Sequence, residues 1–255
     1  MLSIRRKVLD GLLMSGTFLN LGSALTVEIA GKAGFDWLLI DMEHGSGDFS
    51  ELVHQLQAAG CTPAAPIVRI AWNEAPRFKR ALDLGPSGIM VPYVNTVDEA
   101  RLAVAAMRYP PQGIRGVASL NRACDFGKGF EPYFTTANQQ LLTIVQIETP
   151  QAVEQAEAIA AVDGVDVLFV GPTDLSVSLG CPRQFDNPDF QKALRKVVAA
   201  CRKNRKAPGI LLSRHEQVEP MVNEGFTFIG LGSDGGVVCE GMQKLANTFQ
   251  KYRPS

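Results

Sequence analysis

The chain has 255 residues, of which 46% are hydrophobic and 20% charged, so it can bury a large core and is not globally disordered. Its 25 lysines and arginines nearly balance its 26 aspartates and glutamates, which argues against a nucleic-acid partner. Five scattered cysteines without a CxxC pair argue against a disulfide framework or a zinc knuckle. The chain shows neither a convincing signal peptide nor a membrane-spanning apolar run, so we expect a cytoplasmic protein without a membrane partner.

Short apolar runs alternate with amphipathic stretches along the whole chain. The predicted strands are Thr17–Leu21, Trp37–Glu43, Pro66–Ile70, Gly88–Pro92, Leu141–Glu148, Val165–Gly171, Pro208–Leu212 and Phe226–Leu231. The predicted helices are Ala24–Ala33, Phe49–Ala59, Ala75–Leu84, Val97–Arg108, Gln151–Ala161, Pro188–Lys203, Glu216–Glu224 and Gly236–Phe249. The strands are nearly continuous apolar runs, which is typical of parallel strands covered on both faces. Strand–helix repeats throughout a chain of about 250 residues predict a TIM (β/α)8 barrel, with residues 1–255 forming a single domain.

An open doubly wound sheet is the competing fold, but no GxGxxG motif follows the first predicted strand. Several predicted helices begin with a residue that can cap them: Ser23, Asp48, Asn73, Thr96 and Thr149. Residues 109–136 interrupt the rhythm with a stretch of about 28 residues that we expect to be irregular. Such a stretch is either functional, as at an interface, or a flexible insertion.

Active sites of TIM barrels lie at the carboxyl ends of the strands, and several predicted strands here run into polar residues. Glu148 and Asp174 end adjacent strands, so their carboxylates can converge on one point. Two carboxylates without a neighbouring histidine or thiolate suit a hard divalent ion such as Mg²⁺ or Mn²⁺. The alternative is that both are solvated loop groups or helix caps, with Asp174 capping a turn at Leu175–Leu179.

Substrate-contacting positions are expected beside this pair. Gln146 leaves its strand on the same face as Glu148, because the side-chain period of a strand is two. The backbone N–H groups of Thr173 and Asp174, in a tight turn, can hold a substrate carboxylate. The glycine-rich segment Gly230–Gly236 lies where barrels often bind phosphate, or it is a flexible turn.

His44 and Arg69 are the candidate proton acceptor and electrophile. A histidine titrates near neutrality and suits proton transfer, and Asp41, Glu43 or Asp83 could orient it. A structural histidine is the alternative. Arg69 stands at the end of a buried strand, so its positive charge needs a negative partner. The partner is either a substrate carboxylate or enolate, or Asp41 or Glu43 in a salt bridge.

Several strings, taken together and in order, resemble one family. They are Gly34–Gly45, Val68–Asn73, Val91–Thr96, Arg108–Gly116, Gln146–Thr149, Gly171–Ser176 and Gly232–Asp234. The chain resembles the HpcH/HpaI aldolases, which are class II pyruvate aldolases. The resemblance implies cleavage of a 2-oxo-4-hydroxy acid, such as 4-hydroxy-2-oxoheptanedioate or 2-dehydro-3-deoxyglucarate, to pyruvate and an aldehyde.

The resemblance also implies roles for individual residues. Glu148 and Asp174 would bind a divalent ion (Mg²⁺, Mn²⁺ or Co²⁺), His44 would accept the proton, Asp83 would raise the basicity of that histidine, and Arg69 would stabilise the transition state. The predicted catalytic set is His44, Arg69, Asp83 and Asp41. The substrate contacts that go with the resemblance are Gln146, Gly171, Thr173, Asp174 and Leu212.

The partners implied are a small-molecule keto acid and an aldehyde, together with further copies of the chain. The family forms hexamers, built as dimers of trimers, in which Gly236–Phe249 would be exchanged between neighbours. Thr173 stands where many members have Ala, and Phe18 where many have Trp, so the aldehyde is left open. The alternatives are an acyl-CoA carbon–carbon lyase of the citrate/malyl-CoA lyase type and a non-catalytic oligomeric barrel that binds keto acids.

Overall fold

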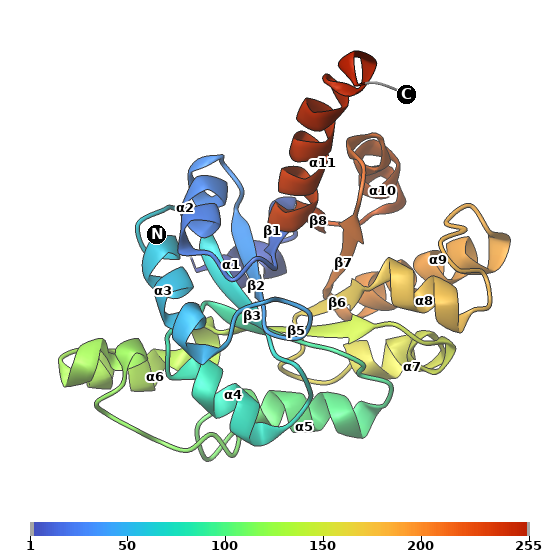
Figure 1. The fold of residues 1–255 in the computed structure, drawn as a ribbon. Helices are drawn as coiled ribbons and strands as arrows, with labels where there is room; N and C mark the ends of the chain where they lie inside the picture. Colours follow the sequence, from blue (N-terminus) through green and yellow to red (C-terminus); the bar gives the residue numbers. More distant parts are fainter. Residues whose placement is uncertain (1–2, 254–255) are drawn as a thin grey trace.

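The computed structural model describes residues 3–253, in which the strands close into a parallel β-barrel (Figure 1). The strands are β1 (Met14–Leu19), β2 (Trp37–Asp41), β3 (Ala65–Arg69), β4 (Gly88–Val91), β5 (Leu142–Ile147), β6 (Val167–Val170), β7 (Ala207–Leu212) and β8 (Phe228–Ser233). Each strand pairs in parallel with the next along the chain, and β8 pairs with β1 to close the barrel. The predicted TIM barrel is confirmed, and every predicted strand overlaps an observed one.

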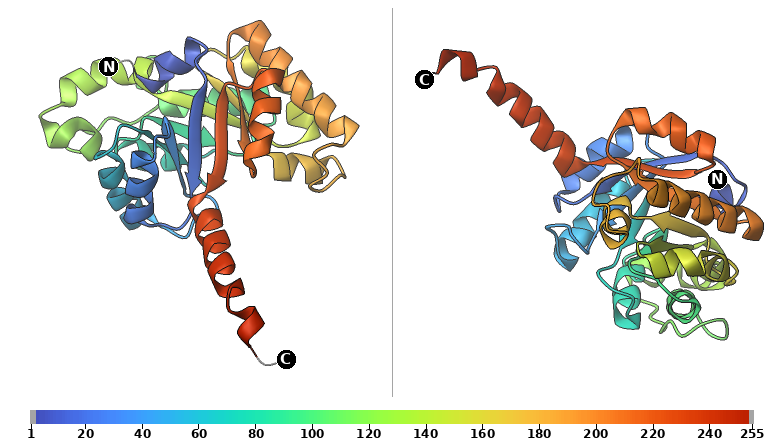
Figure 2. Two further views of the ribbon diagram at one scale, coloured as in Figure 1. Left: turned by 90° about the horizontal axis from the view of Figure 1, so that it is seen from above. Right: turned by 90° about the vertical axis from the view of Figure 1, so that its right-hand side faces the viewer.

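Helices alternate with the strands and surround the barrel (Figures 1 and 2). The α-helices are α1 (Ile4–Leu9), α2 (Ala24–Lys32), α3 (Phe49–Ala59), α4 (Ala75–Leu82), α5 (Val97–Met107), α6 (Phe130–Gln140), α7 (Pro150–Ala160), α8 (Pro172–Ser178), α9 (Pro188–Asn204), α10 (Val218–Glu224) and α11 (Asp234–Asn247). The 3-10 helices are η1 (Arg122–Gly127), η2 (His215–Gln217) and η3 (Gln250–Tyr252). All the predicted helices are confirmed, whereas α1, α6 and α8 were not predicted.

The prediction that residues 109–136 are irregular is wrong in part, because η1 and most of α6 lie within them. Both α6 and α8 were missed because each has a proline in its first turn, and proline usually indicates a turn or a loop. Pro132 falls in the first turn of α6 and Pro172 begins α8, positions at which the missing N–H has no helical partner to lose.

Three predicted helix caps are confirmed by side-chain hydrogen bonds: Asp48, Thr96 and Thr149. Ser23 occupies the predicted N-cap position of α2 but makes no side-chain capping bond. The prediction for Asn73 is wrong, because α4 begins after Glu74. Asn73 instead donates its side-chain N–H to the carbonyl of Glu99, so it links the loop before α4 to the first turn of α5.

Two apolar clusters explain why the strands are nearly continuous apolar runs. One fills the interior of the barrel, where the Trp37 and Phe228 rings stack with their centroids 4.4 Å apart. The other lies between the strands and the surrounding helices. The side chains of α1 at Ile4 and Val8 join the interior cluster at the amino-terminal ends of the strands. The interior is therefore packed with side chains rather than open as a pore, and we call the end of the barrel at the carboxyl ends of its strands the mouth.

Helix α11 projects away from the barrel, as both views in Figure 2 show. None of its residues is buried, and its apolar side chains Val237, Met242 and Leu245 are all exposed. The predicted exchange of this helix between subunits is not tested by the single chain and stays a prediction. Within residues 3–253, no helix is both long and apolar enough to cross a membrane.

Gly16 tests the packing of the barrel interior. A Cβ atom at this position would lie 2.0 Å from Cδ2 of Trp37, so the buried indole would have to move. We expect Gly16→Ala to lower the free energy of unfolding, measured by urea denaturation, by about 1–3 kcal/mol or more. The matched control is Gly116→Ala, where a Cβ would meet the flexible side chain of Lys79 at 3.3 Å. Equal stability of the two variants would contradict this account of the core.

Candidate active site

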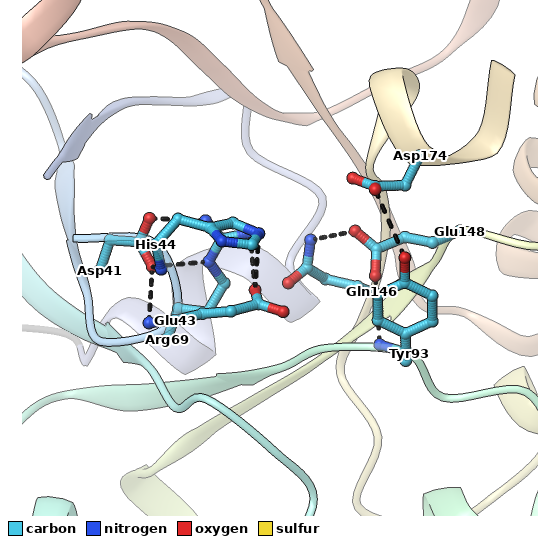
Figure 3. A network of polar contacts seen from close by, with 8 residues as sticks. All are labelled: Asp41, Glu43, His44, Arg69, Tyr93, Gln146, Glu148 and Asp174. Carbon is cyan, nitrogen blue, oxygen red and sulfur yellow. Dashed lines mark hydrogen bonds and ion pairs between the residues drawn. The ribbon is translucent and has the colours of Figure 1, made fainter. Parts of the chain in front are cut away.

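A layer of polar side chains lies above the apolar interior of the barrel, at the carboxyl ends of β2, β3 and β5 (Figure 3). Asp41, Arg69, Gln146 and Glu148 are all buried. Gln146 and Glu148 share a face, as their spacing predicted, and are joined by a hydrogen bond from Gln146 Nε2 to Glu148 Oε1 of 2.8 Å. The charged groups of Asp41, Arg69 and Glu148 therefore lie in a region with little water, where electrostatic interactions are strong.

Arg69 is fixed by two carboxylates. Its Nε and Nη2 donate to the two oxygens of Asp41 at 2.9 and 2.6 Å, and its Nη1 lies 3.0 Å from Glu43 Oε2. The guanidinium carbon lies 5.3 Å from the centre of the Phe18 ring below it. Burial raises the pKa of Asp41, but the bonds from Arg69 outweigh it and hold this pKa below its ordinary value. The salt-bridge alternative for Arg69 is thus what the structure contains, and it places a rigid cation at the mouth.

His44 lies at the open side of this ion pair. Its side chain is 69% exposed, and its Nε2 lies 4.0 Å from Glu43 Oε2. Burial raises the pKa of Glu43, and the nearby Arg69 only partly offsets this effect. Glu43 is therefore the carboxylate that this chain places beside His44, and it also contacts Arg69.

Glu148 is a buried carboxylate without a cationic hydrogen-bond partner. It is 2% exposed, and its Oε2 accepts the backbone N–H of Tyr93 at 3.1 Å. Burial raises the pKa of Glu148 to about 7, and the charges of Asp174 and Glu43 act in the same direction. Gln146 lies two residues before Glu148 on the same face of β5, and its side-chain oxygen is buried and has no hydrogen-bond partner.

Asp174 belongs to the first turn of α8, directly beyond β6. The Tyr93 hydroxyl donates to its Oδ1 at 3.4 Å, so one tyrosine contacts both Glu148 and Asp174 (Figure 3). Asp174 lies inside the helix, and the idea that it caps a turn at 175–179 is wrong. A Cβ at Gly171 would lie 2.2 Å from Glu148 Oε1, which explains why glycine precedes α8.

Tyr93 was missed by sequence reasoning. Its segment, Val91–Thr96, carried part of the family resemblance, but a tyrosine after a strand has no distinctive chemical signal. Its backbone φ of 51° is in the left-handed region, which is uncommon for a residue other than glycine and is found at functional sites.

Two other predicted positions lie near the mouth without a contact to the carboxylate pair. Thr173 is exposed on the first turn of α8. The side chain of Leu212 belongs to the cluster between barrel and helices, whereas its neighbour Leu211 packs against the interior cluster. Leu212 can therefore meet a substrate only through its backbone.

Asp83 is not brought to His44 within one chain. It ends α4 at the side of the barrel where strands begin, whereas His44 follows the carboxyl end of β2. Its carboxylate pairs instead with the buried Arg115, at 3.2 Å.

The glycine-rich segment Gly230–Gly236 is not a flexible turn. It forms the end of β8 and the start of α11. The Asp234 carboxylate accepts the backbone N–H groups of Asn20 and Gly235, both at 2.8 Å. The Asp234 carboxylate thus occupies one backbone donor of this segment, that of Gly235.

The donor set at the mouth has the chemistry of a site for a hard divalent ion. Two carboxylates and the unpartnered amide oxygen of Gln146 supply only oxygen ligands, which Mg²⁺ and Mn²⁺ prefer. Across residues 3–253 no three His, Cys, Asp or Glu side chains gather into a metal cluster, so solvent or substrate would have to supply several ligands.

A family model described as HpcH/HpaI aldolase/citrate lyase matches residues 14–241. The chain belongs to this family. A 5-keto-4-deoxy-D-glucarate aldolase of Escherichia coli (strain K12) is 42% identical over 236 residues, which is 92% of each chain. The resemblance inferred from the sequence is therefore confirmed, and the curated relatives of this HpcH/HpaI protein are carbon–carbon lyases.

Two solved structures share the fold over nearly their whole length. A family protein from Burkholderia cenocepacia J2315 is 35% identical with a TM-score of 0.92, over 97% of this chain and 98% of that one. An HpcH/HpaI aldolase from Desulfitobacterium hafniense DCB-2 is 28% identical with a TM-score of 0.89, over 100% and 99%.

The raised pKa of Glu148 makes the stability of this family member depend on pH. Between pH 4.5 and about 7, the Glu148 carboxyl is already ionised in the unfolded chain but still protonated in the folded one. The free energy of unfolding should therefore fall by about 3 kcal/mol as the pH rises through this range. Glu148→Gln removes this titration. We therefore expect its free energy of unfolding in EDTA, measured with urea at several pH values, to fall less with rising pH than that of the wild type. Parallel profiles would show that burial does not penalise the Glu148 charge.

Proposed function

We propose that the protein is a divalent-metal-dependent aldolase that cleaves a 2-oxo-4-hydroxy acid to pyruvate and an aldehyde. The observation that carries the proposal is the buried Glu148, paired with Asp174 through Tyr93 at the mouth of the barrel. An ionised carboxylate in this position needs a cation, because Arg69 is already bonded to Asp41 and Glu43. The aldolases that are 42% identical to the chain support the reaction class.

The substrate follows from the same relatives. Their name specifies 5-keto-4-deoxy-D-glucarate, a keto acid with hydroxyl groups and a second carboxylate. We propose this substrate or one like it, such as 4-hydroxy-2-oxoheptanedioate.

Glu148 and Asp174 would hold the metal ion. When bound there, a divalent ion would supply Lewis-acid chemistry that disperses the negative charge of an enolate. We propose that Gln146, Gly171, Thr173 and Asp174 contact the keto acid. Phe18, packed beneath Arg69, fills a position that is often larger in the family.

Arg69 would stabilise the enolate oxygen. Asp41 and Glu43 hold its guanidinium in place before the reaction begins, so little reorganisation is needed when negative charge develops. The electron pair of the C3–C4 bond passes to the enolate of pyruvate, and the C4 hydroxyl becomes the aldehyde as it loses its proton. Protonation of the enolate carbon then gives pyruvate.

His44 would take that proton from the C4 hydroxyl. Its exposed ring can reach a ligand at the mouth, and Glu43 lies beside it. Asp83 could influence His44 only from a neighbouring copy, because the two residues lie at opposite ends of the same barrel.

Pyruvate release tests the proposed function. We expect the protein to cleave 5-keto-4-deoxy-D-glucarate, with pyruvate measured by coupling to lactate dehydrogenase. EDTA should abolish cleavage, and Mg²⁺, Mn²⁺ or Co²⁺ should restore it. Arg69→Ala should lower the turnover number by about 100- to 1000-fold, because it removes a transition-state donor.

Lys7→Ala, far from the mouth on α1, is the matched control and should keep full activity. Cleavage that persists in EDTA would contradict the metal site. Keto-acid binding without turnover would support a binding barrel, and activity confined to acyl-CoA thioesters would support a citrate-lyase type of reaction.

We further propose that α11 is exchanged between subunits of a homo-oligomer, a hexamer in this family. The apolar side chains of α11 are exposed, and so are Leu25 and Ile29 on α2 of the same barrel. An exposed apolar helix that leaves its own barrel is explained if a second copy buries it.

Leu245→Glu tests the exchange. Leu245 is 65% exposed in the single chain, so a monomer would tolerate the charge, whereas a buried contact between copies would not. We expect light scattering after size-exclusion chromatography to show a hexamer for the wild type and a smaller species for the variant. Gln243→Glu, on the same helix, controls for the added charge. A monomeric wild type would contradict the proposal.

A further inference from the structure

Tyr93 makes two different bonds to the two acidic residues at the mouth. Its backbone N–H donates to Glu148 Oε2 at 3.1 Å, and its hydroxyl donates to Asp174 Oδ1 at 3.4 Å (Figure 3). The first bond comes from the backbone and does not need the phenol. The second depends on one oxygen atom that phenylalanine lacks.

The backbone of Tyr93 has an unusual conformation that its neighbours maintain. Its φ of 51° is in the left-handed region, which a residue with a Cβ adopts only when the surroundings require it. The side chain of Asn95 donates to the carbonyl of Tyr93 at 3.0 Å, and the Thr149 hydroxyl donates to Asn95 Oδ1. Since Thr149 follows Glu148 in the chain, the loop after β4 is bonded directly to the end of β5.

The ring of Tyr93 is also held from the side. Trp72, on the loop after β3, packs against it with ring centroids 6.2 Å apart and the planes inclined by 32°. The phenol is therefore restrained by an aromatic neighbour on one side and by its bond to Asp174 on the other.

We propose that Tyr93 is a positioning residue for the divalent cation. Its two donors hold Glu148 and Asp174, which repel each other, in the arrangement in which they bind the ion together. The inference rests on the proposed function, and it adds that the hydroxyl of Tyr93 contributes to metal affinity without contacting the substrate. Groups that orient metal ligands typically change affinity by about 10- to 100-fold when removed.

Manganese binding to the full-length protein tests the proposal. We expect Tyr93→Phe to weaken Mn²⁺ binding about 10-fold, measured by the electron paramagnetic resonance signal of free Mn²⁺. Asn95→Ala, which frees the Tyr93 carbonyl, should also weaken it, because the backbone donor to Glu148 is then less well held. The matched control is Tyr109→Phe, which removes a buried hydroxyl without a hydrogen-bond partner and should leave binding unchanged.

Kinetics separate positioning from substrate contact. At saturating Mn²⁺, Tyr93→Phe should have nearly the KM of the wild type for the keto acid. An unchanged Mn²⁺ affinity with a raised KM would overturn the proposal and make the phenol a substrate contact. A wild type that binds no Mn²⁺ and releases no pyruvate would overturn the proposed function itself. If the wild type binds Mn²⁺ and releases pyruvate, but Tyr93→Phe binds Mn²⁺ with the same affinity, only the role of Tyr93 would be overturned.

Discussion

The site depends on one buried carboxylate without a cationic hydrogen-bond partner. Glu148 lies at the end of β5 with almost no exposure, and its bonds come from an amide and a backbone N–H, both of them uncharged donors. Removing an ionised carboxylate from water costs several kcal/mol unless a charge or a strong donor compensates it. The free protein reduces this cost by favouring the protonated form, which is the physical meaning of a pKa of about 7. A bound cation would remove the need for that proton.

The barrel makes this arrangement possible because its two ends differ. Below the polar layer the interior is filled by aromatic and aliphatic side chains, including Trp37, Phe169 and Phe228. Water can therefore approach Glu148 only from the mouth. At the mouth the backbone has adapted to the carboxylate, since Gly171 leaves it room and Tyr93 adopts a left-handed conformation to donate to it. Such local departures from regular geometry are typical of functional sites.

Sequence patterns were sufficient for the features that depend on neighbouring residues. The strands were recognisable because both faces are buried, and the common face of Gln146 and Glu148 followed from the strand period alone. Tyr93 and Asp83 could not be placed in this way. Tyr93 reaches Glu148 and Asp174 through a turn conformation that no local pattern encodes, and the position of Asp83 depends on where α4 ends relative to the mouth.

The balance of charge at the mouth explains why a keto acid would need a metal ion there. Asp41, Glu43, Glu148 and Asp174 face a single arginine, Arg69, so the fully ionised site carries a net charge of about −3. A substrate carboxylate would be repelled by such a site, and the cation that could attract it is already bonded on two sides. A divalent ion on Glu148 and Asp174 would reduce this net charge to about −1 and would place positive charge where the substrate must bind. The same argument disfavours a barrel that binds keto acids without metal, because its mouth would present mainly negative charge to an anion.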